Sequence, residues 1–373
     1  MKNLTKSLLR LMLFLPALAA SNVFAEETEQ PLKYVNALEL RMINQITEET
    51  NTPYTRIPKY LEDSVRHDLW QRSQCSSGLG IRFSSDSKRI GVKYKLLWDT
   101  HMFHMADTGL KGTDLYVLTD DGRWEYVNTN RPVADKKTKE CTKTYVNNMD
   151  GRMHEYLIYL PLYDGVTEMW VGVDSASVIQ QPVLDTPRKS KKVVMYGTSI
   201  LQGGCSTRTG MVATNMIQRD LNCEVVNWGF SGEGKMDFCM ARALAKVEDA
   251  DVYVLDPVPN CTEMMCDTIT YDFVKTLADL RPDVPIVMVE GPIYSYAKYD
   301  SFFKEYLPKK NAKFRKNYEK LVADGYKNLY YLPCDGLSGY DNEGTVDGIH
   351  FTDLGFRRYA DKLIPILKPL LDK

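Results

Sequence analysis

Hydrophobic and polar residues alternate along the first half of the chain, as they do in strands that bury one face. The alternation is clearest at residues 90–96, 156–162 and 169–173. Asp120-Asp121-Gly122 separates two further short runs and indicates a hairpin. No long stretch of this half has a helical period. We therefore predict an all-β domain over residues 32–188, a β-sandwich of the jelly-roll-like kind.

The second half changes to short, continuous apolar runs, which suit strands buried on both faces of a parallel sheet. Between the runs, apolar residues recur three or four positions apart and predict helices. Thr352 is the expected N-cap of the last helix, and Gly325 is expected to end the helix before it. The runs lie at residues 193–196, 225–226, 252–255, 286–289 and 329–332, and the helical spacing at 213–221, 236–247, 269–280, 314–322 and 356–367. This alternation predicts a doubly wound α/β domain over residues 192–373, preceded by a connector rich in proline and charge.

The first 25 residues have the three parts of a secretory signal peptide. Lys2, Lys6 and Arg10 precede an apolar run at 11–20, and Val23-Phe24-Ala25 offers a cleavage site. A membrane anchor or a buried helix is the less favoured interpretation, because the apolar run is too short to span a bilayer. We therefore expect cleavage after Ala25 and a periplasmic or extracellular protein without stable membrane insertion.

The composition is that of a globular protein, 44% hydrophobic and 26% charged. A formal net charge of −2 gives no electrostatic footprint for nucleic acid. Eight cysteines permit disulfides in an exported chain, but their spacing predicts no particular pairing. His101 and His104 have His-x-x-His spacing, and we expect hydrogen-bonded histidines there rather than metal ligands. The sequence thus predicts no metal site and leaves the oligomeric state open.

Candidate catalytic residues follow the predicted parallel strands, where open α/β sheets bind their ligands. Ser199 comes directly after the first of these strands. A serine hydroxyl needs a base to act as a nucleophile, and histidine is the usual base. His350 is the one histidine of the second half, and Asp347 stands three residues before it, where a turn would let it orient the imidazole. Asp256 and Asp335 also follow strands, but the short spacing to the histidine favours Asp347.

Ester hydrolysis also needs hydrogen-bond donors for the oxyanion that develops on the substrate. The backbone N–H of Ser199, at a strand-to-helix turn, is one candidate. The N–H of Gly232 is a second, because a glycine lets the backbone approach closely. The side-chain amide of Asn260 is a third. Together, the strand ends hold the parts of a serine esterase.

These residues resemble the four sequence blocks of the SGNH (GDSL-type) hydrolases. The block serine matches Ser199, the oxyanion glycine Gly232 and the oxyanion asparagine Asn260, while the Asp-x-x-His pair matches Asp347 and His350. The resemblance extends through the second half of the chain, in the family's order. It implies a flavodoxin-like sheet flanked by helices, and hydrolysis of esters or thioesters without a cofactor.

Two blocks depart from the usual family pattern. Gly197-Thr198-Ser199 stands where Gly-Asp-Ser is usual, and Val258-Pro259-Asn260-Cys261 where Gly-x-Asn-Asp is usual. Both resemble a subgroup of exported bacterial esterases whose preceding β-domain carries a Gly-x-Asp-Leu-Tyr motif. Gly112-Thr113-Asp114-Leu115-Tyr116 matches that motif. The arrangement is also similar to two-domain carbohydrate esterases, an analogy that bears on the substrate only weakly.

Export and the β-domain favour an acylated carbohydrate as substrate, with O-acetyl as the expected group. A lipid or lysophospholipid is the enzymatic alternative, and a non-catalytic glycan-binding protein that retains the fold is another. Arg208 and Tyr294 are candidate substrate contacts near the expected crevice. Tyr294 belongs to an aromatic segment, residues 292–310. We expect this segment to be a long loop that packs against sugar rings, or that covers the sheet or the β-domain.

Overall fold

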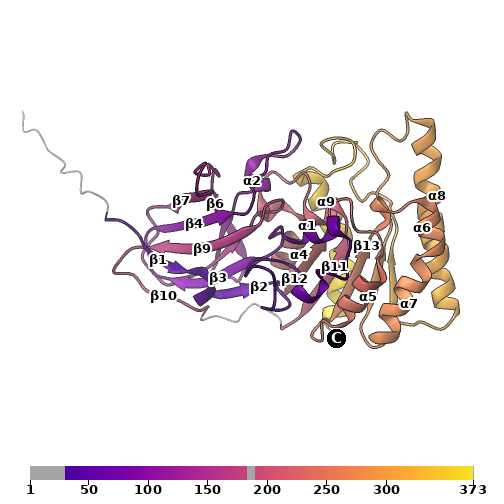
Figure 1. Cartoon of the computed structure of the whole chain (residues 1–373), viewed down its shortest axis with the longest axis horizontal. Coiled ribbons are helices and arrows are strands. Elements are labelled where there is room, and N and C mark those ends of the chain that lie inside the picture. The colour runs from indigo at the N-terminus through magenta and orange to yellow at the C-terminus, as the bar shows by residue number, and fades with distance from the viewer. Residues whose placement is uncertain (1–29, 183–189, 373) are drawn as a thin grey trace, which may run out of the picture. The chain divides into compact units, whose positions relative to one another are not determined.

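Two antiparallel sheets enclose a shared hydrophobic core in the described part of the first half (Figure 1). The computed structural model describes residues 30–182 and 190–372, so the predicted signal peptide lies outside the described residues. One sheet has the strand order β1-β9-β4-β7, and the other has the order β10-β3-β8-β5-β6 with β2 paired to β3. The strands are β1 Lys33–Asn36, β2 Arg41–Ile43, β3 Gly80–Ser85, β4 Ile90–Leu96, β5 Asp114–Leu118, β6 Trp124–Thr129, β7 Glu140–Val146, β8 His154–Tyr159, β9 Val166–Val173 and β10 Ile179–Gln180.

The alternation in the sequence arises because each sheet turns one face to this core. Ile81 and Phe83 from β3 are fully buried, as are Val92 and Tyr94 from β4 in the opposite sheet. Residues two positions apart on a strand point to the same face, so these pairs come from one face of each sheet. The predicted all-β fold of this half is confirmed.

A parallel sheet with the strand order β12-β11-β13-β14-β15 forms the second half. This is the flavodoxin-like order, in which the chain reverses direction across the sheet between β11 and β13. The strands are β11 Lys192–Gly197, β12 Glu224–Gly229, β13 Val252–Asp256, β14 Ile286–Val289 and β15 Leu329–Leu332. Almost all side chains of β11 to β14 are buried, which explains why these strands appear in the sequence as continuous apolar runs.

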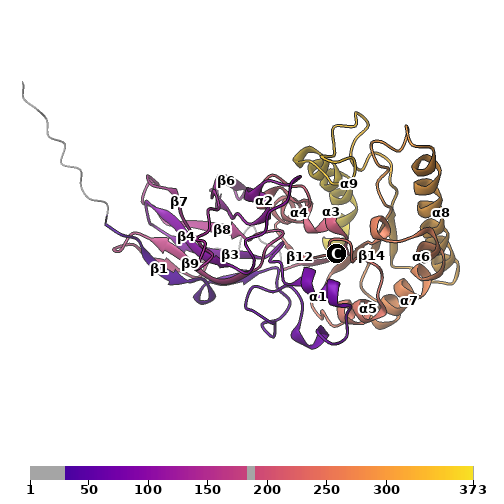
Figure 2. The same cartoon turned by 45° about the horizontal axis from the view of Figure 1, so that its top comes forward.

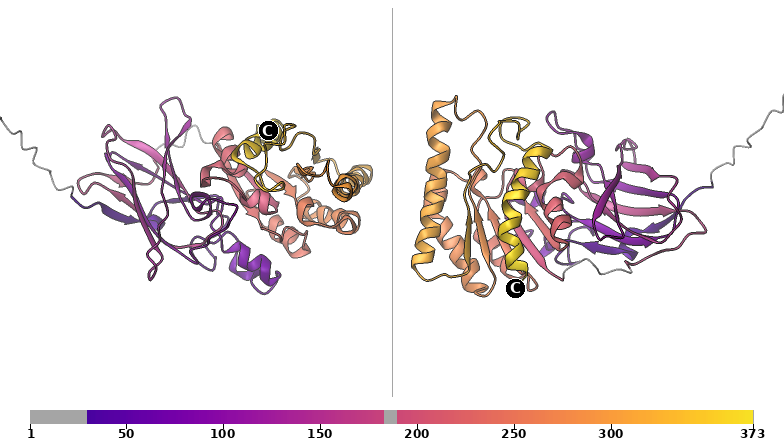
Figure 3. Two further views of the ribbon diagram at one scale, coloured as in Figure 1. Left: turned by 90° about the horizontal axis from the view of Figure 1, so that it is seen from above. Right: turned by 180° about the vertical axis from the view of Figure 1, so that it is seen from behind.

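Helices cover both faces of the parallel sheet (Figure 2). α4 (Ala213–Leu221) and α9 (Asp353–Leu371) pack on one face, where α9 runs alongside the strands (Figure 3). α5 (Phe238–Ala245), α7 (Thr270–Leu280) and α8 (Ser301–Ala323) pack on the other. The Thr352 side chain accepts a hydrogen bond from Gly355 N, so the predicted N-cap of the last helix is confirmed. No helix among the described residues is long and apolar enough to cross a membrane.

Helix α1 (His67–Ser73) lies within the all-β half, and at seven residues it is too short to give a long helical period in the sequence. One expectation about local structure was wrong. Residues 292–310 are not one long loop, because α8 begins at Ser301. The Asp300 side chain caps that helix by accepting from the N–H groups of Phe302 and Phe303, and Pro308 lies inside it. The aromatic residues of this segment are therefore divided between a loop and the first turns of a helix.

The two halves share buried polar contacts, and the chain from Leu32 onward packs as one compact unit. Arg56, from the first half, is 1% exposed and donates through Nη1 to Asn227 O at 3.1 Å and Gly229 O at 2.6 Å. These carbonyls belong to β12. Burial lowers the pKa of Arg56 to about 10, and its guanidinium lies 4.9 Å from the Phe230 ring centroid. Hydrogen bonds to four carbonyls, two of them from Cys75 and Arg72, compensate the loss of water around this cation.

Candidate active site

Ser199, His350 and Asp347 form a continuous hydrogen-bonded chain. Ser199 is the first residue of the short helix α3 (Ser199–Gln202), immediately beyond the end of β11. Its Oγ lies 2.9 Å from Nε2 of His350, and Nδ1 of His350 lies 2.7 Å from Oδ2 of Asp347. The serine is 6% exposed. The structure thus brings together the three residues that the sequence singled out, in the geometry of an activated nucleophile.

A tight turn explains how an aspartate three residues from a histidine reaches its ring. Asp347 Oδ1 accepts hydrogen bonds from the backbone N–H groups of Ile349 (3.0 Å) and His350 (2.7 Å), which leaves Oδ2 for the imidazole. Partial burial alone would raise the pKa of Asp347. The hydrogen bonds from His350 and Ile349 outweigh it and hold that pKa below its usual value. The carboxylate is therefore charged where it meets His350.

The other two candidate acids have different partners. Asp256, at the end of β13, is 1% exposed and accepts a hydrogen bond from Tyr359 Oη at 3.0 Å. Burial raises the pKa of Asp256 to about 8. Asp335 accepts a hydrogen bond from Tyr340 Oη at 2.7 Å. Asp347 is the one described carboxylate that bonds His350, as the spacing argument predicted.

Ser199 N lies at the start of α3, and the other two candidate oxyanion donors, Gly232 N and the Asn260 amide, lie on two neighbouring turns. Gly232 has φ +76°, in the left-handed region that favours glycine. Asn260 accepts a hydrogen bond from Gly234 N through Oδ1 at 3.2 Å, which directs its NH2 group the other way. Gly234 also packs so closely on Gly197 that a Cβ would lie 2.2 Å from its carbonyl oxygen. No described residue accepts a hydrogen bond from Ser199 N, Gly232 N or Asn260 Nδ2, so all three donors are available to a ligand.

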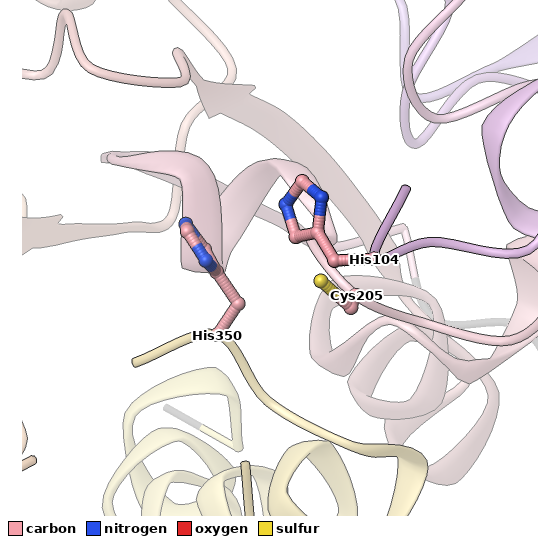
Figure 4. Close-up of side chains that lie close together, drawn as sticks. All are labelled: His104, Cys205 and His350. Atoms are coloured by element: carbon pink, nitrogen blue, oxygen red, sulfur yellow. The ribbon is translucent and has the colours of Figure 1, made fainter. Parts of the chain in front are cut away.

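The first half of the chain contributes directly to this site, a point that the sequence left open. Tyr163 Oη donates to the backbone oxygen of Ser199 at 3.1 Å, and Gln202 Nε2 donates to Leu162 O at 3.0 Å. His104, in the loop between β4 and α2 (Asp107–Leu110), lies with its ring centroid 5.7 Å from that of His350 (Figure 4). Sequence reasoning missed His104, because the second half already contained a histidine that explained the base.

Arg208 and Tyr294, the two candidate substrate contacts, lie in different surroundings. Arg208 Nη1 donates to Asp114 Oδ2 and to Tyr116 Oη, both at 2.7 Å, so it binds two residues of the Gly-x-Asp-Leu-Tyr motif. Its guanidinium also lies 3.8 Å from the ring centroid of Tyr126. The structure therefore gives Arg208 a set of protein partners, and its role toward a substrate stays a prediction.

Tyr294 lines a cavity of about 330 Å³ beside the loop that carries Asp347. Ser295, in the same wall, donates through its backbone to Gly348 O at 3.3 Å, which fixes the wall to that loop. The lining combines aromatic rings with hydroxyl, amide and carboxylate groups: Ile293, Tyr294, Ser295, Lys298, Cys334, Asp335, Gly336, Leu337, Ser338, Gly339, Tyr340 and Asn342. Such a surface suits a polar ligand with apolar faces.

All eight cysteines are free thiols, a question that the sequence left open. One of them, Cys205, lies beside His104 and His350. It is 3% exposed, and burial raises the pKa of its thiol to about 12.

Comparison with known proteins agrees with the two halves of the fold. The model of the GDSL-like lipase/acylhydrolase family matches residues 190–368, and a model described as the N-terminus of SGNH-hydrolase-type esterases, GxDLY, matches residues 32–179. A protein from Bacteroides ovatus ATCC 8483 that carries the name GDSL-like lipase has 32% identity and a TM-score of 0.85 over 91% of this chain and 98% of its own. No curated protein matches the chain.

Two more distant structures share the fold. The salicylyl-acyltransferase SsfX3, from a tetracycline biosynthetic pathway, has 15% identity and a TM-score of 0.71 over 91% of this chain and 97% of its own. A family two carbohydrate esterase from Clostridium thermocellum, in complex with cellohexaose, has 12% identity and a TM-score of 0.53 over 79% of this chain and 93% of its own. At these identities the likeness concerns the fold alone.

Proposed function

The chain belongs to the GDSL-like lipase/acylhydrolase family of SGNH-type esterases, and from this premise we propose that it is an exported serine esterase that removes O-acetyl groups from carbohydrate. The observation that carries the proposal is the hydrogen-bonded chain from Ser199 through His350 to Asp347. Without a base in contact, a serine hydroxyl is a weak nucleophile, and here the base and the group that orients it are both in place.

Each residue has one role in the proposed reaction. Ser199 Oγ attacks the acyl carbonyl while His350 Nε2 takes its proton, and Asp347 stabilises the imidazolium that forms. The N–H groups of Ser199 and Gly232 and the Asn260 amide stabilise the negative charge on the carbonyl oxygen. The bond between the carbonyl carbon and the sugar oxygen then breaks, and His350 gives its proton to that oxygen, so the sugar leaves with a free hydroxyl. Water, activated by the same histidine, releases acetate from the acyl-enzyme.

The cavity beside the Asp347 loop supports carbohydrate over lipid as the acyl carrier. Its rings and polar groups match the apolar faces and hydroxyl edges of a sugar, whereas a long acyl chain would need an apolar channel. Tyr340, 74% exposed, gives this cavity an open aromatic wall. The likeness to the carbohydrate esterase adds little to this argument, because it concerns the fold alone.

Acetate release from a panel of acetylated polysaccharides tests the substrate class, with the Ser199→Ala variant as the blank. A parallel series of p-nitrophenyl esters of increasing chain length should show a sharp preference for acetate. A preference for long chains would favour a lipid substrate instead. Well-folded protein that a fluorophosphonate fails to label at Ser199 would favour a non-catalytic glycan-binding protein.

The cavity's part in binding is tested separately. We expect Tyr340→Ala to lower kcat/KM on an acetylated oligosaccharide while leaving p-nitrophenyl acetate hydrolysis unchanged, because the small ester carries no sugar for the cavity to bind. Tyr299→Ala is the matched control, since Tyr299 is 82% exposed but outside the lining. Equal effects of the two variants on the oligosaccharide would contradict the assignment.

Export is tested on the mature protein. Mass spectrometry of protein from the producing cell should find Glu26 at the N-terminus, in the periplasm or the medium. Protein that retains Met1 and stays in the cytoplasm would overturn this part of the proposal.

A further inference from the structure

Three potential metal ligands from separate segments converge next to the candidate nucleophile (Figure 4). His104 comes from the loop after β4, Cys205 from the loop after α3, and His350 from the loop before α9. One donor atom from each, a ring nitrogen or the Sγ, lies within 4.8 Å of the other two. We propose that these three side chains bind Zn2+, and that the bound metal switches the esterase off by capturing His350.

The donor set is the first argument for zinc. Two imidazoles and one thiolate are ligands that Zn2+ prefers, and three protein ligands leave a fourth tetrahedral position for water. The nitrogen and sulfur donors bound to one tetrahedral zinc lie about 3.3–3.5 Å apart, given bonds of about 2.0 Å to nitrogen and 2.3 Å to sulfur. The present donors lie within 4.8 Å of one another, so each pair must approach by at most about 1.5 Å to reach that spacing.

The surroundings of each donor are the second argument. Nδ1 of His104 is buried and has no hydrogen-bond partner among the described residues, so this nitrogen lacks the contact that buried polar atoms normally have. Cys205 N donates to Phe351 O at 3.1 Å, which ties the cysteine to the residue after His350. Asp347 bonds Nδ1 of His350, as a carboxylate commonly bonds the free ring nitrogen of a zinc-binding histidine.

The two existing bonds of His350 explain why zinc would inhibit. Nδ1 bonds Asp347 and Nε2 bonds Ser199. With Asp347 holding Nδ1, zinc takes Nε2, which breaks the bond to Ser199 and occupies the lone pair that the base needs. When zinc binds, a Zn–S bond replaces the S–H bond of Cys205, and the thiol proton is released to solvent. The inhibition rests on the proposed function, whereas the metal site does not.

The test is a titration of the full chain with ZnCl2, by calorimetry and by activity on p-nitrophenyl acetate. We expect one Zn2+ per chain, loss of activity at the same stoichiometry, and full recovery with EDTA. Loss of a group that only orients a metal ligand weakens metal binding about 10–100-fold. His104→Gln and Cys205→Ser remove the ligands themselves and should weaken it at least that much. His101→Gln and Cys239→Ser are the matched controls and should bind and respond as the wild type does.

Cobalt gives a readout that does not depend on activity or on overall stability. Co2+ in the site should show a thiolate-to-cobalt charge-transfer band that disappears in Cys205→Ser and persists in Cys239→Ser. The proposal is overturned if zinc binding and inhibition are unchanged in His104→Gln and Cys205→Ser, or if the charge-transfer band is absent. If the wild type hydrolyses no ester but binds zinc and shows the band, the metal site stands and the proposed function fails.

Discussion

The Nε2 atom of His350 lies 2.9 Å from the Oγ of Ser199, although 151 positions separate the two residues in the chain. The contact joins the end of the first strand of the parallel sheet to the turn before the last helix. Because both lie at the carboxyl edge of that sheet, the fold holds the nucleophile and its base together before any substrate binds. The site is therefore preorganised, and its parts can be tested one at a time.

Replacing Ser199 by alanine removes the nucleophile without adding volume to a buried position. We expect kcat on p-nitrophenyl acetate to fall at least about 10³-fold, since only binding and the oxyanion donors remain. Circular dichroism and Tm should stay at wild-type values. A variant as active as the wild type would overturn the assignment of the nucleophile.

The substitution Asp347→Asn tests the orientation of the base. An asparagine keeps the turn, because its oxygen can still accept from the N–H groups of Ile349 and His350. Its NH2 group then faces Nδ1 of His350 and favours the wrong tautomer, so kcat should fall about 10²–10⁴-fold with little change in KM. Asp279→Asn, on α7, is the control and should leave kcat unchanged. A loss in KM alone would mean that Asp347 contacts substrate instead.

Asn260→Ala removes a side-chain donor from the oxyanion site. We expect kcat to fall about 10²–10³-fold, and KM to change much less, because the donor acts mainly on the charge that develops in the transition state. Steady-state kinetics on p-nitrophenyl acetate give both values. If Asn260→Ala lowers kcat/KM on p-nitrophenyl acetate and the affinity for a non-hydrolysable analogue by the same factor, then Asn260 acts in the ground state instead.

Asp256 makes stability depend on pH. Burial raises its pKa in the folded protein to about 8, against about 3.9 in an unfolded chain. Between these values the folded state holds a proton that the unfolded state has released. Stability from this group is therefore lost as pH rises, by at most about 1.4 kcal/mol per pH unit.

The substitution Asp256→Asn removes that titration while keeping an acceptor for Tyr359. The difference in free energy of unfolding, variant minus wild type, should increase steadily from pH 5 to pH 8. Urea denaturation at several pH values measures it. A difference that stays constant over this range would mean that Asp256 ionises normally in the folded protein.

Arg208→Ala should destabilise the protein by about 3–5 kcal/mol, because it removes the cation that pairs with the fully buried carboxyl group of Asp114. The backbone N–H of Gly210 would then be the remaining strong donor to that group. A double-mutant cycle with Asp114→Asn isolates the pair. Arg208→Lys should recover only part of the loss, since lysine cannot reproduce the planar stacking on Tyr126. Unchanged stability together with a higher KM would instead support substrate binding by Arg208.

The pattern of the sequence predicted those features of the fold that depend on residues within a single strand or helix. The strands of the parallel sheet were evident because both of their faces are buried, and the N-cap at Thr352 because a helix end needs a local acceptor. The positions of Ser199, Asp347 and His350 followed, since strand ends of one parallel sheet meet at one edge. Their distances and partners are what the structure adds.

What the sequence did not predict depends on contacts between segments far apart in the chain. The His104 ring lies near the ring of His350 in the other half of the chain, and no local pattern indicates this contact. Arg208 resembled a substrate ligand because its acidic partner, Asp114, is 94 positions away. Helix α8 was partly mistaken for a loop because Pro308 and a series of aromatic residues mask its start, which depends on a single cap at Asp300.

The carbonyls that Arg56 caps at the end of β12 limit how this architecture can be rearranged. A truncated catalytic half would leave Asn227 O and Gly229 O facing solvent or a void, next to the turn that carries Gly232. A chimera with a foreign sandwich would have to supply a guanidinium at the same place. Either half should therefore keep its stability in a new protein only when Arg56 and the carbonyls that it bonds are transferred together.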